Sequence, residues 1–177
     1  AEATEPAFNA HLEELQAAEL LNESHRSRHA AYTFKHALTQ EVAYCSLLKE
    51  HRRELHARIL EALETLAMNR DAEHASSAAQ SYPRPEYLEQ LAYHAMRGDA
   101  WAEAVGYSRQ AGEKAMARSA HREAASYFEQ AIHALAHLPD TRDTREQAID
   151  LRLALRSALH PCGELRRAMT CVGEAEV

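Results

Sequence analysis

A nine-residue pattern that occurs twice constrains the fold of this chain more than any other feature. Residues 103–111 and 123–131 both match E-A-x-x-Y-x-x-Q-A. The pattern puts alanine, tyrosine and alanine at positions i, i+3 and i+7, which share one face of a helix. Small residues on that face let two helices approach closely, and the tyrosine fills the groove between them. Successive helices that bury the same face indicate a helical solenoid.

The composition agrees with a helical fold. Alanine contributes 36 of the 177 residues, whereas valine and isoleucine together contribute seven. Helices favour alanine, leucine, glutamate and arginine, while strands favour β-branched and aromatic residues. The sequence therefore predicts an all-α protein, excludes a mainly β fold and disfavours a βαβ fold.

Charge and cysteine usage limit the partners and the compartment. The formal net charge is −7, which disfavours nucleic acid and anionic membranes as partners. No apolar run approaches the roughly 18 residues of a membrane span, and residues 1–6 lack the order of a signal peptide. The three cysteines are an odd number without a CxxC pair, so neither a disulfide framework nor a zinc knuckle is indicated. A cytoplasmic location is the expectation.

Apolar spacing divides the first half of the chain into predicted elements. We expect helices over 8–22, 38–48 and 51–68, a polar loop over 23–30 and a short hairpin strand at 32–34. The small, polar and proline-containing segment 69–85 is the predicted linker between an N-terminal part, 1–68, and a repeat region, 86–160. The residues expected on the buried stripes are Phe8, Leu12, Leu15, Ala18 and Leu21, then Leu38, Val42, Cys45 and Leu48, then Leu55, Ile59, Ala62, Leu63 and Leu66.

The second half reads as four regular helices followed by an unassigned tail, 161–177. Gly98 is expected to end the first of these helices in a left-handed conformation, and Asp99 to cap the next. Pro139 stops the third helix, and Thr144 with Gln147 forms a predicted capping box for the fourth. The predicted buried stripes are Leu88, Leu91, Ala92 and Ala95; Trp101, Ala104, Val105, Ser108, Ala111, Gly112 and Ala115; Ala124, Tyr127, Phe128, Ala131, Leu135 and Leu138; and Ala148, Leu151, Leu155, Ala158 and Leu159, with Ile149 and Leu153 as a second apolar edge.

The repeat region resembles tetratricopeptide repeats. Gly112, Ala124, Phe128 and Ala131 stand at the intervals of the small and aromatic positions in that consensus. The large aromatic residue usual in its first helix is absent, and the proline comes later than in the consensus. The resemblance implies antiparallel helix hairpins in a right-handed superhelix, with a concave surface to which Arg109, Glu113 and His94 are candidate contributors.

The N-terminal part resembles a segment of bacterial signalling ATPases. The stretches that carry the resemblance are 32–44, 46–48 and 52–59, followed by 91–99 and 111–120. Together they are similar to the region of cyclase-linked AAA/STAND-type ATPases in which a winged-helix region passes into TPR-like repeats. The resemblance implies a winged-helix remnant near the N-terminus and a segment that follows the ATPase domain. No G-x-x-x-x-G-K-[ST] phosphate loop occurs in the sequence, so this segment is predicted to be non-catalytic.

One residue is singled out by that resemblance. A winged-helix histidine of some STAND-type ATPases contacts the nucleotide phosphate, and His36 stands in a similar context. A nucleotide contact by His36 is implied only for an intact parent protein; the alternative is that His36 caps or braces the helix expected from residue 38.

Other chemistry-bearing residues are interpreted as structural or as contacts with partners. His25 and His29, like His133 and His137, are four apart, a spacing that can hold zinc on a helix. Neither pair has the H-E-x-x-H form, so no metal and no cofactor are predicted. Cys45 is expected in the core, and Arg52 and His56 are candidates to face a partner domain.

The predicted function is a non-catalytic interaction and regulatory segment of a multidomain bacterial signalling protein. Its expected partners are a protein, a peptide or other domains of the parent chain. Apolar surface that the upstream ATPase domain would cover in the parent protein favours a homodimer. Two alternatives come from other classes. One is the regulatory region of a DNA-binding transcriptional activator of the STAND ATPase type, and the other is a small helical enzyme with a histidine-based site.

Overall fold

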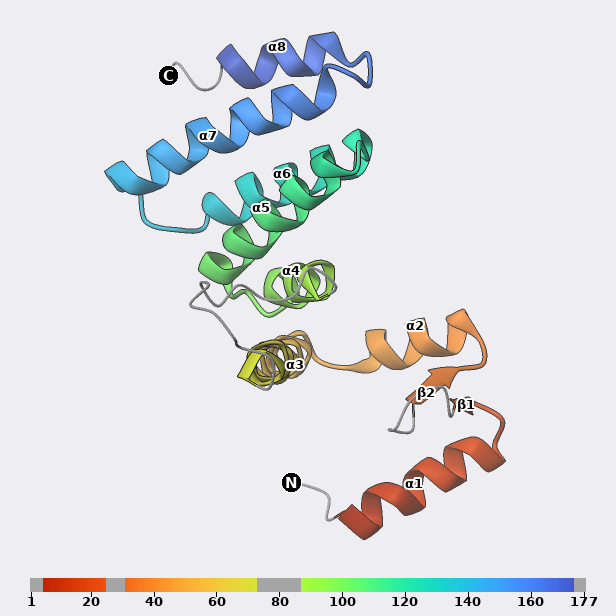
Figure 1. The fold of residues 1–177 in the computed structure, drawn as a ribbon. Coiled ribbons are helices and arrows are strands. Elements are labelled where there is room, and N and C mark those ends of the chain that lie inside the picture. Colours follow the sequence, from red (N-terminus) through yellow and green to blue (C-terminus); the bar gives the residue numbers. More distant parts are fainter. Residues whose placement is uncertain (1–4, 25–30, 73–86, 174–177) are drawn as a thin grey trace. The chain divides into compact units, whose positions relative to one another are not determined.

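The fold is mostly helical, in agreement with the composition. The computed structural model describes residues 5–24, 31–72 and 87–173, and in these ranges it contains eight helices and two short strands (Figure 1). The chain divides into two compact units, Ala1–Lys49 and Glu50–Val177. The predicted linker, 69–85, begins inside a helix that runs to Ala72, and its remainder lies outside the described residues.

The first unit contains a β-hairpin between two helices. Helix α1 (Glu5–Ala17) is followed by strand β1 (Leu21–Ser24), strand β2 (Ala31–Phe34) and helix α2 (Ala37–Ser46). The strands are antiparallel, with Leu21 opposite Phe34, so the predicted hairpin strand is confirmed.

The predicted helix over 8–22 is too long. Glu19 has a left-handed backbone conformation, with φ of 57°, and this ends the helical path because a left-handed residue cannot continue a right-handed helix. Leu21 consequently enters the sheet, and part of the expected loop 23–30 is strand. Lys35 forms an ion pair with Glu19 at 2.6 Å and donates its amide to the Leu20 carbonyl, which ties the hairpin to the turn.

The apolar side of α2 is exposed, contrary to the prediction of a buried stripe. Leu38 and Val42 are 74% and 67% exposed, and Cys45 and Leu48 are exposed as well. Cys45 is therefore not a core residue. The spacing identified an amphipathic helix correctly, but burial requires an element packed on that side, and a single sequence does not reveal one.

The second unit is a stack of helices. After α3 (Lys49–Ala72) come α4 (Leu88–Arg97), α5 (Trp101–Ala117), α6 (His121–Leu135), α7 (Arg142–Leu159) and α8 (Leu165–Gly173). From α4 to α8 each helix packs on the next one along the chain (Figure 1). The short connections favour this arrangement, because they leave consecutive helices adjacent and antiparallel.

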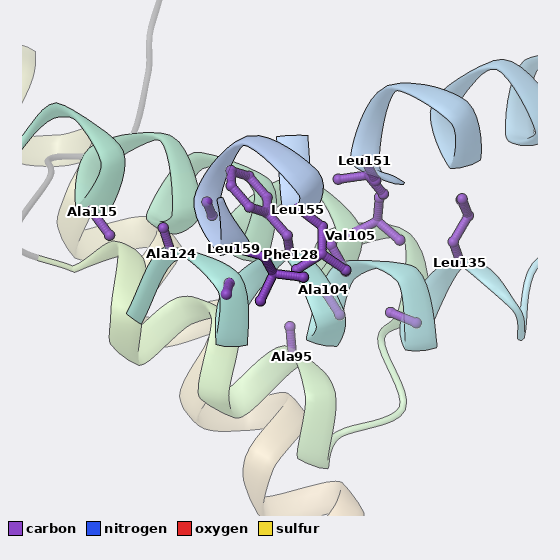
Figure 2. Packing of buried hydrophobic residues seen from close by; sticks show 14 of the residues in the cluster. Ala95, Ala104, Val105, Ala115, Ala124, Phe128, Leu135, Leu151, Leu155 and Leu159 are labelled. Carbon is purple, nitrogen blue, oxygen red and sulfur yellow. The ribbon is translucent and has the colours of Figure 1, made fainter. Parts of the chain in front are cut away.

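The core of this unit contains many alanines, several leucines and one large aromatic ring. Every described alanine that the repeated motif predicted to be buried is buried, and Phe128 lies among them with 2% of its surface exposed (Figure 2). A Cβ atom placed on Gly112 would lie 2.6 Å from the Phe128 ring. Gly112 of α5 therefore packs directly against the aromatic ring of α6, and the absence of a side chain at this position makes room for that ring.

The turns on either side of α5 share one structure, which extends the sequence repeat beyond the nine-residue motif. Asp99 and Ser119, 20 residues apart, have positive φ angles of 56° and 60°. Ala100 donates its amide to the Ala95 carbonyl, and Ala120 does the same to Ala115. These are the bonds of a Schellman helix ending, which satisfies carbonyls at the end of a helix. The structural repeat is therefore one turn followed by one helix, first with α5 and then with α6.

Two details predicted for the first of these turns are wrong. Gly98 has a φ of −87°, and Asp99 adopts the left-handed conformation; Asp99 does not cap α5, whose N-cap is Ala100. Gly98 serves close packing, since a Cβ there would lie 3.2 Å from the backbone nitrogen of Ala57 in α3. Aspartate tolerates the left-handed region better than most residues.

The buried side of α3 also differs from the prediction. Leu55, Ile59 and Leu66 are exposed, whereas His56, Leu60 and Ala67 are buried. The helix has apolar residues on two sides, and the side that packs includes a histidine, which hydropathy ranks as polar. Periodicity alone selected the more apolar side, and this is the side without a covering element among the described residues.

The C-terminal part of the stack corrects two further expectations and adds a helix in a segment that the sequence left unassigned. The capping box of α7 is formed by Thr141 and Thr144, whose side chains each accept the other's backbone amide, and it does not involve Gln147. Ile149 and Leu153 are exposed and do not form a second buried edge. Part of the unassigned tail folds as α8, which buries Ala168 against the core.

Candidate interaction surface

A pair of histidines joins α3 to α4. The Nδ1 atoms of His56 and His94 lie 2.8 Å apart, so one ring donates a hydrogen bond and the other must accept it. His56 is buried. The Tyr93 ring meets both imidazoles edge-on, and the Arg97 guanidinium lies over the Tyr93 ring at 4.8 Å. This hydrogen bond requires the Nδ1 of at least one imidazole to be unprotonated.

An ion pair and close packing support the same junction. Arg53 of α3 contacts the Asp99 carboxylate at 2.8 Å, and the left-handed turn at Asp99 presents that carboxylate next to Gly98. Because Gly98 has no side chain, the backbone of α3 approaches the end of α4 closely. The sequence made Arg52 and His56 candidates to face a partner domain, whereas His56 contacts α4 of its own unit.

The histidine junction gives the protein a predicted acid sensitivity. Burial lowers the pKa of both His56 and His94 below 6.5, and the positive charge of Arg97 lowers both further, as does His94 in the case of His56. The unfolded chain therefore binds more protons than the folded chain below about pH 6.5. We expect the contribution of the pair to stability to be complete above this pH and to be lost as the pH falls, by at most about 1.4 kcal/mol per pH unit for each histidine.

This dependence is measured by urea denaturation between pH 5 and pH 8, followed through the fluorescence of Trp101, the single tryptophan of the chain. The double variant His56→Gln/His94→Gln should flatten the profile, because glutamine can hydrogen-bond but does not titrate in this range. His160→Gln removes an imidazole outside the junction and serves as the matched control. A wild-type slope that survives in the double variant would contradict the assignment.

Polar contacts link α5 both to the helix before it and to α3, which is not its neighbour along the chain. The Tyr107 hydroxyl in α5 donates to Glu64 of α3 at 2.6 Å, and burial together with this bond raises the pKa of Tyr107. Lys114 of α5 contacts Glu89 of α4 at 2.7 Å. Tyr107 is the tyrosine of the first motif copy, so the repeat supplies tertiary contacts through its polar group as well as through its ring.

Trp101 and two histidines form an aromatic cluster between α5 and the end of α6. The rings of Trp101 and His137 are stacked 3.9 Å apart, and His133 meets Trp101 edge-on. Helix α6 ends at Leu135, so His137 belongs to the following turn, and the centroids of the His133 and His137 rings lie 5.1 Å apart. Among the described residues, no cluster of three or more histidine, cysteine, aspartate or glutamate side chains is suited to a metal ion.

A groove lies between α6, the loop after it and α7. It has a volume of about 250 Å³, and both apolar side chains and polar or charged side chains line it. Arg145 makes two hydrogen bonds to Asp140, at 2.7 and 2.9 Å, and these lower the pKa of that carboxyl. The residues that line it are Ile132, Leu135, Ala136, Leu138, Asp140, Thr144, Arg145, Ala148 and Arg152.

Arg152 is the unusual member of this groove. Its Nη1 donates to the Ala148 carbonyl at 3.2 Å, and its Nε is buried with no acceptor among the described residues. A buried donor without a partner costs about 1–3 kcal/mol. The sequence analysis did not single out Arg152. The available signal is an arginine placed between Leu151 and Leu153 in an otherwise apolar stretch.

The remaining candidate residues lie apart from one another. His36 is the N-cap residue of α2 and is exposed; its side chain makes no capping bond, so it does not cap the helix through the imidazole. Arg109 and Glu113 form an exposed ion pair along α5 at 3.1 Å. His25 and His29 lie outside the described residues. The structure therefore brings together His56 with His94, and Trp101 with His133 and His137.

Comparison with known proteins gives no family assignment. No protein-family model, no curated protein and no solved structure matches this chain. Within the described ranges, none of the helices combines the length and the apolar character needed to cross a membrane.

Proposed function

We propose that this chain is a non-catalytic helical-repeat segment that binds a protein or peptide within a multidomain bacterial signalling protein. The observation that carries the proposal is the repeated helix-and-turn unit around α5. The two motif copies, in α5 and α6, bury equivalent alanines, and each of these helices follows a turn with the same backbone bonds. Repetition of one packing unit builds an extended stack, and the surface of such a stack is suited to another chain.

The tetratricopeptide resemblance is supported by the contact between Gly112 and Phe128. In that consensus the small position of one helix faces the aromatic position of the next, and here a ring rests on a bare glycine. A right-handed superhelix with a concave side is the arrangement that this resemblance implies. Arg109 and Glu113 are then candidates for its binding surface, as the sequence analysis proposed.

The cyclase-linked ATPase resemblance supplies the proposed context. The segment 32–44 that carries it includes strand β2, the N-cap residue His36 and most of α2. A β-hairpin followed by a helix is compatible with a winged-helix remnant. In the intact parent protein the exposed His36 is proposed to contact a nucleotide phosphate, and the repeats are proposed to report partner binding to the ATPase domain. Such coupling requires contacts that differ between two states.

The proposal is tested by selection of binders and by assays of turnover. Random heptapeptides displayed on phage are selected against the purified chain, and we expect enriched sequences whose affinity is reduced by substitutions on the surface of the second unit. The same preparation is incubated with ATP or GTP and Mg²⁺. Nucleotide hydrolysis or cyclic-nucleotide synthesis, or the absence of any enriched peptide, would refute the proposal.

A mobility shift at low salt tests the alternative of a DNA-binding regulator. The net charge of −7 predicts at most weak retardation. Tight, sequence-specific retardation would instead favour the transcriptional-activator alternative.

A further inference from the structure

We propose that the groove between α6 and α7 holds a peptide segment in which an apolar side chain lies next to a carboxylate. This inference rests on the proposed function and specifies the partner chemistry of one surface. It depends on three properties of the groove: its size, its charge and the unsatisfied donor of Arg152.

The size of the groove favours part of a larger ligand over a whole small molecule. Its volume of about 250 Å³ is below the range of roughly 300–1,000 Å³ of sites that enclose a drug-sized compound. One or two side chains fit such a volume. The apolar part of its lining includes Ile132, Leu135 and Leu138, and it is suited to an aliphatic side chain.

The positive charge of the groove favours a ligand that carries a carboxylate next to its apolar side chain. Two arginines and one aspartate line it, so their formal charges sum to +1, in a chain of net charge −7. Asp140 already holds Arg145 through two hydrogen bonds. The remaining positive charge is that of Arg152.

Arg152 provides the geometry for a carboxylate. A guanidinium carries five donors in a planar fork that matches two carboxylate oxygens. The Nη1 of Arg152 is engaged by the Ala148 carbonyl, whereas its buried Nε has no acceptor in the part of the chain that the structure describes. A carboxylate that enters the groove beside these apolar side chains accepts a hydrogen bond from this Nε and pairs with the positive charge of Arg152.

The test uses the full chain and the phage-displayed random heptapeptides described above. We expect enriched peptides to contain aspartate or glutamate next to an aliphatic residue. Affinity is then measured by fluorescence anisotropy with a labelled synthetic copy of the enriched peptide. Arg152→Gln should weaken binding at least 10-fold. Arg142→Gln should change it less than 2-fold, because Arg142 lies on the same helix but is 90% exposed and does not line the groove.

Two further arms make the result specific. Replacing the acidic residue of the peptide by its amide should weaken binding to the wild-type chain by about the same factor as Arg152→Gln does. It should weaken binding to Arg152→Gln much less, because that variant already lacks the interaction between the carboxylate and the guanidinium. Arg152→Lys, which keeps the charge but removes the fork, should bind with intermediate affinity and replaces the glutamine variant if circular dichroism shows that variant to be unfolded. Octanoate is the probe for a free small carboxylate.

The outcomes separate this inference from the proposed function. Enriched peptides that lack a carboxylate, or that bind Arg152→Gln as tightly as wild type, overturn the groove assignment and leave the interaction function standing. Competition by octanoate at lower concentration than the peptide overturns the choice of a peptide as ligand. Failure to enrich any peptide overturns both proposals.

Discussion

Phe128→Ala is expected to destabilise the second unit by about 3–5 kcal/mol. The Phe128 ring is 2% exposed and packs among the alanines of the helix stack (Figure 2). Its removal leaves a cavity that the surrounding alanines and leucines fill only in part, because they are held in place by the helices that carry them. A loss of this size is a large fraction of the roughly 5–15 kcal/mol that stabilises a typical protein.

Urea denaturation followed by Trp101 fluorescence measures this effect, since Trp101 lies in the second unit. Phe8→Ala is the matched control: the same substitution, in the first unit, at a ring that is 55% exposed. It should leave the Trp101 transition within about 0.5 kcal/mol of wild type. A loss below 1 kcal/mol for Phe128→Ala would show that the ring is not the centre of this packing.

Two glycines of α5 are expected to respond to alanine with opposite signs. At Gly112 the added Cβ would lie 2.6 Å from a ring that is enclosed on all sides, so overpacking should cost about 1–3 kcal/mol. This net loss is expected although alanine favours a helix by about 1 kcal/mol over glycine. At Gly106 no atom lies within 4 Å of the added Cβ, so Gly106→Ala should stabilise the unit by up to about 1 kcal/mol.

The two variants control for each other, because both exchange glycine for alanine in one helix. The measurement is the shift of the urea midpoint at constant slope. In a Phe128→Leu background, Gly112→Ala should cost less than in wild type, which would place the strain in the contact between these two residues. Equal changes in the free energy of unfolding for Gly106→Ala and Gly112→Ala would contradict close packing between Gly112 and the Phe128 ring.

The helical elements of the second unit were predictable because their signals are local. Leu88, Leu91, Ala92 and Ala95 recur at helical spacing, and all four are buried as expected. The same holds for the alanines of the repeated motif. In each case one helix face is much less polar than the other, so periodicity identifies the buried side without knowledge of the neighbours.

Predictions failed where the outcome depends on a neighbour. In α3 the more apolar stripe with Leu55 and Ile59 is exposed, and His56 is buried because His94 supplies a hydrogen-bonding partner. Cys45 and Val42 lie on a correctly predicted amphipathic helix that has no covering element among the described residues. Gly98 was assigned to the turn, yet the turn conformation belongs to Asp99, and Gly98 is required by the approach of α3.

The candidate groove was beyond the reach of the sequence for the same reason. Ile132 and Leu138 come from α6 and its loop, and Arg152 from α7, so their proximity follows from how two helices pack. The sequence by itself determined the helical class, the nine-residue motif that recurs after 20 residues and the small residues of the buried faces, because those depend on local propensity and on periodicity along one helix. Only the tertiary structure decided which side of α3 is covered, which residue takes the left-handed turn and where a guanidinium is left without an acceptor, because each depends on atoms that are distant in the chain and adjacent in space.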